Sequence, residues 1–163
     1  MESCKSLGIR RSGSASSQSF PTSRPMRDPA DCIDYIKRVI GLPGDTVQCC
    51  DAEGRLLVNG TAIDEQVYLK PGEGSGPQEF NITVPEGKLW VMGDNRGDSS
   101  DSRFHDPGGT GADGSVPIDL VVGKAVVTVW PLNRMGWLSD HDDVFADVPD
   151  PGNQAVGLAA RET

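Results

Sequence analysis

The sequence predicts a mainly β fold built from antiparallel sheets. Its 163 residues include 20 glycines and 12 prolines, a composition that favours many short strands and tight turns over a helix bundle. Short apolar stretches recur between clusters of turn-forming residues, and some alternate apolar with polar side chains as half-buried strands do. A chain of this length fits one domain with a core of its own.

The first half of the domain contains four apolar segments of strand length. They are Ile33–Ile40, Thr46–Cys50, Leu56–Val58 and Ile63–Leu69. The Pro-Gly turn in Leu42–Asp45 closes the first of these segments. Residues 51–55 form the turn between the second and the third, and Asn59-Gly60 suits a type I′ hairpin after the third.

The second half contains three further candidate strands. They are Phe80–Val84, Lys88–Met92 and the valine-rich Leu120–Trp130, which we expect to be buried. Residues 71–78 form a glycine-rich loop, and Pro85-Glu86-Gly87 predicts the turn that joins the first two strands. Residues 104–113 are expected to be a second flexible segment.

Composition divides the chain into three parts. Residues 1–30 are rich in Ser, Arg, Pro and Gly and are predicted to be disordered, because they cannot bury enough apolar surface. Residues 31–139 form the predicted domain, and residues 140–163 an acidic, weakly ordered and solvated tail. The net charge is +4 over residues 1–27 and −13 over the remainder. An acidic body argues against nucleic acid as a partner.

The four cysteines do not have the spacing of metal ligands. Cys49 and Cys50 are adjacent, and the chain has no Cys-x-x-Cys pair. We therefore predict neither a metal nor another cofactor. A Cys32–Cys49 disulfide is one alternative, but the sequence favours free thiols or side chains on opposite sides of a strand. No stretch approaches the ~20 apolar residues that span a bilayer, and the N-terminus does not have the pattern of a signal peptide.

The segment Gly93–Arg103 is unusually polar. It follows the apolar strand Lys88–Met92 and contains no Leu, Ile, Val, Phe or Ala. Such a segment cannot fill a core, but its carboxylates and guanidinium groups can form a rigid network of hydrogen bonds. Loops of this kind often position catalytic or binding groups.

Together with an upstream segment, this loop resembles the paired signatures of the bacterial type I signal peptidases. Residues 35–45 read Tyr-Ile-Lys-Arg-Val-Ile-Gly-Leu-Pro-Gly-Asp, and residues 93–103 read Gly-Asp-Asn-Arg-Gly-Asp-Ser-Ser-Asp-Ser-Arg. A third match covers 114–125, with the Trp130–Trp137 segment after it. The resemblance covers residues 31–139.

This resemblance implies a serine endopeptidase that uses a Ser–Lys dyad. Enzymes of this family remove signal peptides from exported pre-proteins after small residues of the Ala-x-Ala type. They are anchored in the membrane and act at its extracytoplasmic face. Pre-proteins and the membrane surface are therefore the implied partners, and the chain itself contains no segment that reads as the anchor.

The resemblance also assigns roles to residues of the two signatures. Lys37 corresponds to the general base, and Ser99 to the serine that orients the lysine. Asp101 and Arg103 correspond to a charged pair that braces the loop, with Ser102 between them. A lysine at its ordinary pKa of about 10.4 is neutral in only about one molecule in a thousand near pH 7.4. Lys37 must therefore be desolvated to work as a base.

Other polar residues in the signatures have open interpretations. Asp94, Asn95 and Arg96 either close a turn by hydrogen bonding or take part in catalysis. Arg38 is interpreted as structural.

The family nucleophile has no clear counterpart. It lies in a Ser-Met-x-Pro-Thr motif well before the lysine, whereas the one upstream Pro-Thr here, Pro21-Thr22, places Gln18 at the serine position. Four nearby serines lack the motif: Ser12, Ser14, Ser17 and Ser19. We expect the chain as given to be inactive, since amide side chains are not nucleophiles of this type. A start inside a longer gene or a frameshift would account for this region.

Two alternatives to a peptidase stay open. One is a non-catalytic β module that binds signal peptides or a partner. The other is a self-cleaving repressor-type domain, which would need a DNA-binding helix-turn-helix that residues 1–30 do not contain.

Overall fold

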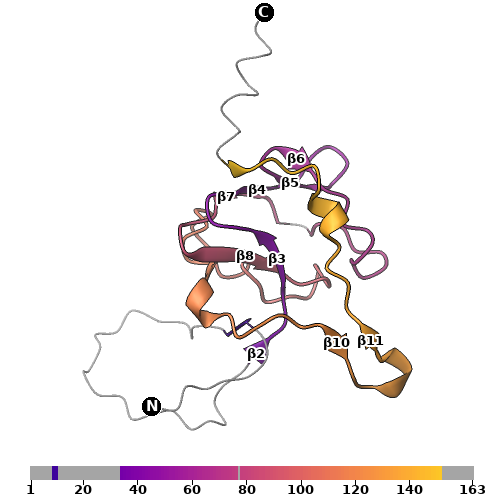
Figure 1. Ribbon diagram of the computed structural model, residues 1–163. Helices are drawn as coiled ribbons and strands as arrows, with labels where there is room; N and C mark the ends of the chain where they lie inside the picture. Colours follow the sequence, from indigo (N-terminus) through magenta and orange to yellow (C-terminus); the bar gives the residue numbers. More distant parts are fainter. Residues whose placement is uncertain (1–8, 11–33, 77, 152–163) are drawn as a thin grey trace, which may run out of the picture.

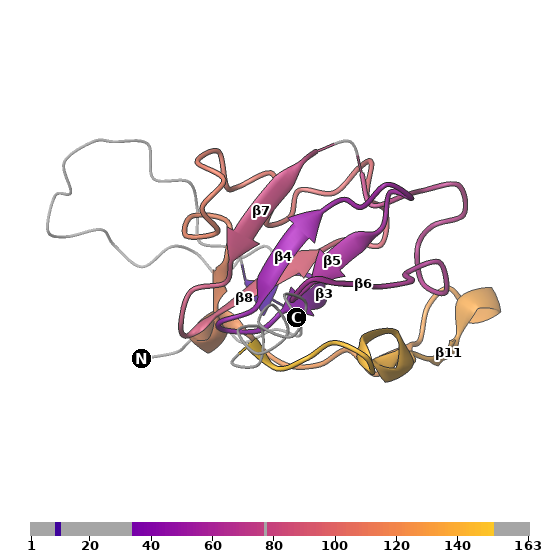
Figure 2. The same cartoon turned by 90° about the horizontal axis from the view of Figure 1, so that it is seen from above.

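The computed structural model describes residues 9–10, 34–76 and 78–151. Two antiparallel sheets lie one over the other (Figures 1 and 2). The larger has the order β6-β5-β4-β7, made of β4 (Thr46–Cys49), β5 (Leu56–Val58), β6 (Thr61–Ala62) and β7 (Phe80–Thr83). The smaller has the order β3-β8-β9, made of β3 (Arg38–Gly41), β8 (Lys88–Met92) and β9 (Val116–Pro117). The predicted mainly antiparallel β fold is confirmed.

Two short strand pairs and three 3-10 turns complete the described part of the chain. The pairs are β1 (Ile9–Arg10) with β2 (Asp34–Tyr35) and β10 (Val127–Thr128) with β11 (Gly136–Trp137). The turns are η2 (Ile118–Leu120), η3 (Leu132–Arg134) and η4 (Asp142–Phe145). Within the described residues, no helix is long and apolar enough to cross a membrane.

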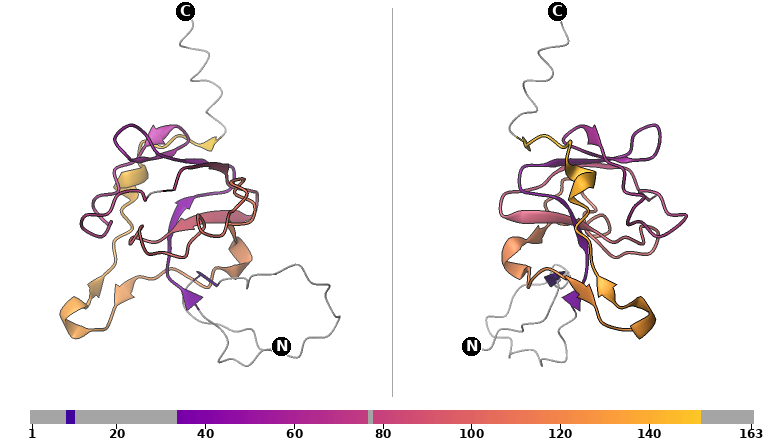
Figure 3. Two further views of the ribbon diagram at one scale, coloured as in Figure 1. Left: turned by 180° about the vertical axis from the view of Figure 1, so that it is seen from behind. Right: turned by 45° about the vertical axis from the view of Figure 1, so that its right-hand side comes forward.

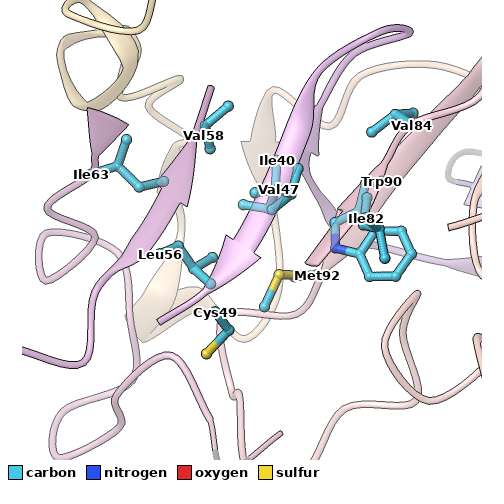
Figure 4. Close-up of a cluster of buried hydrophobic side chains, with 10 residues drawn as sticks. All are labelled: Ile40, Val47, Cys49, Leu56, Val58, Ile63, Ile82, Val84, Trp90 and Met92. Carbon is cyan, nitrogen blue, oxygen red and sulfur yellow. The ribbon is translucent and has the colours of Figure 1, made fainter. Parts of the chain in front are cut away.

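The core fills the space between the two sheets (Figure 4). Ile40 of β3 and Trp90 and Met92 of β8 meet Val47 of β4 and Leu56 of β5, all of them buried. Gly41 permits this close approach, because a Cβ at its position would lie 2.7 Å from Val47 Cγ2. The well-packed core holds the end of β8, and with it the polar loop that follows, in one place.

Several predicted elements agree closely with the structure. Leu56–Val58 and Lys88–Met92 are strands with the predicted bounds. At Asn59-Gly60 both residues have positive φ, 52° and 79°, as a type I′ hairpin requires. Phe80–Val84 is a strand up to Thr83.

Two predicted strands are wrong. Ile63–Leu69 contains turns, because the backbone amides of Tyr68 and Leu69 both donate to the Glu65 carbonyl. Leu120–Trp130 is not a continuous buried strand either, since it contributes an isolated bridge at Val121 and the two-residue strand Val127–Thr128, which pairs with β11. Figures 1 and 3 show the β10–β11 segment projecting from the body as an arm, so no second layer covers its valines. Apolar runs become buried strands only where another layer packs on them.

The first predicted strand, Ile33–Ile40, is interrupted. β2 ends at Tyr35 and pairs with β1, whereas β3 begins at Arg38 and pairs with β8. The break falls at Ile36 and Lys37, where the chain changes partner strands. Its effect is to place Lys37 outside any strand ladder.

The tail predicted for residues 140–163 differs from the structure at its N-terminal end. Val144, Phe145 and Val148 pack against the core, and Asn59 Nδ2 donates to the Pro149 carbonyl at 2.7 Å. Residues 141–149 are therefore not a solvated tail, because three apolar side chains within five residues give this acidic segment a face to bury.

The prediction of free thiols is wrong at two positions. Cys49 and Cys50 form a disulfide with each other. β4 ends at Cys49, so strand alternation no longer forces the two side chains apart. Cys4 and Cys32 lie outside the described residues.

Candidate active site

The two signature segments meet where β3 and β8 pair. Arg38 is opposite Met92 in the ladder, so Lys37 lies next to Gly93, the first residue of the polar loop. Lys37 is half-buried, and its Nζ donates a hydrogen bond to Ser99 Oγ at 2.7 Å. Two side chains separated by 62 residues in the sequence are thus in direct contact. The structure brings together the lysine and the serine for which the sequence predicts a common site.

Gly93 closes over this pair. A Cβ at this position would overlap the side chain of Ser99 and lie 3.5 Å from Lys37 Nζ. The Gly93 amide donates to Asp101 Oδ2 at 3.0 Å, and its carbonyl accepts from Arg96 Nε at 2.9 Å. The absence of a side chain lets the backbone pass against the amine, and both polar groups of this residue are satisfied.

Asp101 and Arg103 form the predicted bidentate ion pair. Arg103 Nε donates to Asp101 Oδ1 at 2.9 Å and Nη2 to Oδ2 at 2.7 Å, and both residues are buried. Burial alone would raise the pKa of Asp101, but hydrogen bonds from Arg103 and from the Gly93 amide outweigh it and lower the pKa. A hydrogen bond from the Ser99 hydroxyl contributes in the same direction. Asp101 is therefore a fixed carboxylate behind Ser99.

The remaining donors of Arg103 bind one carbonyl of the glycine-rich loop and one carbonyl of the polar loop itself. Its Nη1 donates to the carbonyl of Ser75 at 3.2 Å, and its Nη2 to the carbonyl of Arg96 at 3.0 Å. Ser102, between the two charged residues, accepts a hydrogen bond from the Val91 amide at 2.9 Å and so ties the loop back to β8. These bonds fix the polar loop to β8 and to the glycine-rich loop, and they also cross-link the polar loop internally.

A second buried ion pair was missed by sequence reasoning. Arg96 donates to Glu65 from Nη1 at 2.9 Å and from Nη2 at 2.5 Å, and the two side chains are 0% and 2% exposed. The bond from Arg96 to the Gly93 carbonyl closes a turn, which is the first of the two interpretations given for Arg96. The ion pair with Glu65, in a distant segment, is a further contact. No local pattern in the sequence signals this pair, because Glu65 would share a face with Ile63 and Leu69 only in a strand, and this segment forms turns instead.

Arg38 belongs to the same network. Its Nε and Nη2 donate to the two carboxylate oxygens of Asp94, each at 2.9 Å, and its Cζ lies 3.8 Å from the centroid of the Tyr68 ring. Burial opposes the charge on Arg38, but the Asp94 hydrogen bonds and charge outweigh it and raise its pKa. The structural interpretation of Arg38 agrees with these contacts.

Exposed side chains occur next to the pair in the sequence. Ile36, which precedes Lys37, is 70% exposed, and Ser100, which follows Ser99, has its Oγ 3.0 Å from His105 Nε2. Within residues 34–76 and 78–151, no three His, Cys, Asp or Glu side chains are grouped to hold a metal ion. Gln18, Pro21-Thr22 and the upstream serines lie outside the described residues. An amine held against a hydroxyl in a rigid loop can accept a proton from a neighbouring nucleophile.

Comparison with known proteins agrees with the motifs. Residues 20–130 match the family model described as signal peptidase, peptidase S26. The chain is similar to a probable signal peptidase I of Mycobacterium leprae, with 42% identity over 131 residues that cover 66% of this chain and 43% of that protein. It is also similar to signal peptidase I of Mycobacterium tuberculosis H37Rv, with 44% identity over 124 residues that cover 66% of this chain and 40% of that protein.

A solved structure is similar as well. The crystal structure of a signal peptidase I from Enterococcus faecalis V583 is 34% identical and covers 55% of this chain and 80% of that chain, with a TM-score of 0.40. The chain spans about two fifths of the length of the two mycobacterial relatives, 43% and 40%. The family match covers more than half of the chain. The chain therefore belongs to the signal peptidase family, peptidase S26.

Proposed function

We propose that this protein serves as a signal peptidase I, a serine endopeptidase that cleaves signal peptides from exported pre-proteins after small residues. The observation that carries this proposal is the 2.7 Å hydrogen bond between Lys37 Nζ and Ser99 Oγ. It places the amine against a braced loop, and the exposed side chain of Ile36, next to Lys37 in the chain, is one that an extended signal peptide could contact.

In this proposal Lys37 transfers the protons. A serine hydroxyl attacks the scissile carbonyl while Lys37 accepts its proton. Lys37 then protonates the leaving amine, and the acyl-enzyme is hydrolysed by water. Ser99 keeps Nζ directed at the nucleophile, and the buried Asp101–Arg103 pair prevents the loop from drifting. Such preorganisation matters, because a shift of about 1 Å in a catalytic group can cost about 10²-fold in rate.

The nucleophile decides whether these residues alone catalyse the reaction. Gln18 stands at the position of the family serine when Pro21-Thr22 is aligned with the Pro-Thr of the motif. We therefore expect no turnover by the 163-residue chain. Gln18→Ser supplies the missing hydroxyl at that position.

The test compares four purified proteins on one substrate. The substrate is a fluorogenic peptide with an Ala-x-Ala site, in detergent micelles. The proteins are the chain, its Lys37→Ala variant, its Gln18→Ser variant and Gln18→Ser combined with Lys37→Ala. We expect cleavage only by Gln18→Ser. Cleavage by the unaltered chain that Lys37→Ala abolishes would support the peptidase and refute the assignment of Gln18. Cleavage that survives Lys37→Ala would refute Lys37 as the base.

A non-catalytic module is the second candidate, and the residue at position 18 is the observation that favours it. In that case both the unaltered chain and Gln18→Ser would bind the same peptide saturably and would not cleave it. Against it stands the retention of Lys37 and Ser99 in contact, which binding alone does not require.

We also propose that the protein works at the extracytoplasmic surface of the cell membrane. The support is the β10–β11 arm, where four large apolar residues are highly exposed: Trp130 at 74%, Leu132 at 70%, Met135 at 64% and Trp137 at 84%. An apolar patch of this kind marks an interaction surface, and tryptophan favours the membrane–water interface.

Tryptophan fluorescence tests this placement. The chain has three tryptophans, and Trp90 is fully buried, so a response to lipid must come from Trp130 and Trp137. We expect phosphatidylcholine vesicles to shift the emission to shorter wavelength, and Trp130→Ser with Trp137→Ser to abolish the shift. Identical spectra with and without vesicles would contradict the membrane proposal.

A further inference from the structure

We propose that Glu65 and Tyr68 are positioning residues that hold Lys37 against Ser99. The inference rests on the proposed function, since it concerns the same pair. Neither Glu65 nor Tyr68 lies in a signature segment; both come from the turns between β6 and β7. The contacts nevertheless connect them to both sides of the pair.

The first connection runs from Glu65 to the loop that carries Ser99. Glu65 holds both terminal nitrogens of Arg96, and Arg96 Nε donates to the Gly93 carbonyl. The Gly93 amide is held from the other direction by Asp101. The peptide groups around Gly93 are therefore fixed at both ends, and Gly93 is the residue that packs against Ser99 and Lys37.

The second connection runs from Glu65 to the segment that carries Lys37. Tyr68 Oη donates to Glu65 Oε1 at 2.7 Å, and the Tyr68 ring lies under the guanidinium of Arg38. Burial, with the charge of Glu65, raises the pKa of Tyr68, so its hydroxyl stays protonated and donates. Arg38 follows Lys37 in the chain and is locked by Asp94, which follows Gly93.

One carboxylate thus links the two segments that must stay in contact. If Glu65 served the fold alone, its loss would lower stability and leave the Lys37 environment of the folded molecules unchanged. If it positions the pair, small changes in the network alter Lys37 in molecules that are still folded. Tyr68→Phe is the decisive variant, because it keeps the ring on Arg38 and removes a single hydrogen bond to Glu65.

The experiment is competitive acylation with trace acetic anhydride, read by mass spectrometry of the lysine peptides. Lys124, whose side chain is 65% exposed, is the internal reference. The unaltered chain, Tyr68→Phe, Glu65→Gln and a matched control, Arg55→Gln, are labelled across a pH series after circular dichroism shows each to be folded. Arg55→Gln also removes an arginine–carboxylate pair, but in the turn between β4 and β5.

We expect the Lys37-to-Lys124 labelling ratio to rise about fivefold in Tyr68→Phe, the equivalent of one lost hydrogen bond. The half-buried amine becomes accessible when Gly93 and Arg38 loosen. The pH profile of Lys37 should move, and that of Lys124 should not. Arg55→Gln should leave both as in the unaltered chain.

Unchanged Lys37 labelling in folded Tyr68→Phe would overturn the inference, as would an equal change in Arg55→Gln. If Glu65→Gln does not fold, Tyr68→Phe still decides, since it leaves the Glu65–Arg96 pair intact. The labelling reaction does not depend on cleavage of a signal peptide by the protein. A chain that cleaves nothing can therefore still support or refute this inference, separately from the proposed function.

Discussion

Replacing Gly93 by alanine adds one methyl group at the most crowded point of the site. The new Cβ would lie 2.8 Å from Ser99 Cβ, would overlap Ser99 Oγ and would lie 3.5 Å from Lys37 Nζ. Gly93 has no positive φ, so alanine meets no backbone strain there and the effect is purely steric. Ser99 must move, and the 2.7 Å bond to Lys37 breaks or lengthens.

The magnitude follows from three contributions, two that destabilise the folded state and one that favours it. Overpacking a well-filled site costs about 1–3 kcal/mol, and loss of one hydrogen bond adds about 1 kcal/mol. Alanine restricts the unfolded chain and returns about 0.4–1 kcal/mol. We expect a net loss of about 2 kcal/mol in the free energy of unfolding. At a urea dependence of about 1–3 kcal/mol per molar, the midpoint falls by about 1 M.

Urea unfolding followed by circular dichroism measures this loss. Gly123→Ala is the matched control, because a Cβ there meets nothing within 4 Å and its φ is not positive. That control should leave the midpoint unchanged or raise it slightly. If Gly93→Ala unfolds at the same urea concentration as Gly123→Ala, the crowding at Gly93 is not as described and the geometry of the pair is refuted. In an active form of the protein, the same change should lower the cleavage rate by about 10²-fold.

Three further predictions concern the loop, the core and the C-terminal segment. Because hydrogen bonds from Arg103 and others lower the pKa of Asp101, its stabilisation is complete above the unfolded-state pKa of about 3.9 and is lost as pH falls through the lower folded value. Urea midpoints at pH 7 and below pH 4 should therefore differ more for the unaltered chain than for Asp101→Asn, and equal differences would disprove this. Gly41→Ala should lower stability by about 1–3 kcal/mol, since its Cβ would lie 2.7 Å from a core valine; an unchanged melting temperature would count against it. Asn59→Ala removes the bond to the Pro149 carbonyl, so hydrogen exchange of residues 141–149 should accelerate; equal exchange would show that this bond does not hold the segment.

Local patterns in the sequence were sufficient for much of the fold. Leu56–Val58 and Lys88–Met92 have the composition of buried strands, and Asn59-Gly60 specifies its turn because both residues tolerate positive φ. The common site of Lys37 and Ser99 could be predicted only from the two signatures together, since no local rule relates residues this far apart. The functional roles of Lys37, Ser99, Asp101, Ser102 and Arg103 stay predictions.

Tertiary structure decided what depends on contacts between distant segments. Glu65 has no local reason to be buried, and its ion pair with Arg96, 31 residues away in the sequence, joins the turns after β6 to the loop after β8. The break at Lys37 arises because the strands on either side pair with different partners, and the β10–β11 valines are exposed because no layer covers them. Periodicity and turn chemistry act over a few residues, so the sequence by itself determined several strands and turns, and its two signatures determined the family. The pairing of buried charges depends on the packing of whole sheets, and only the folded chain determines it.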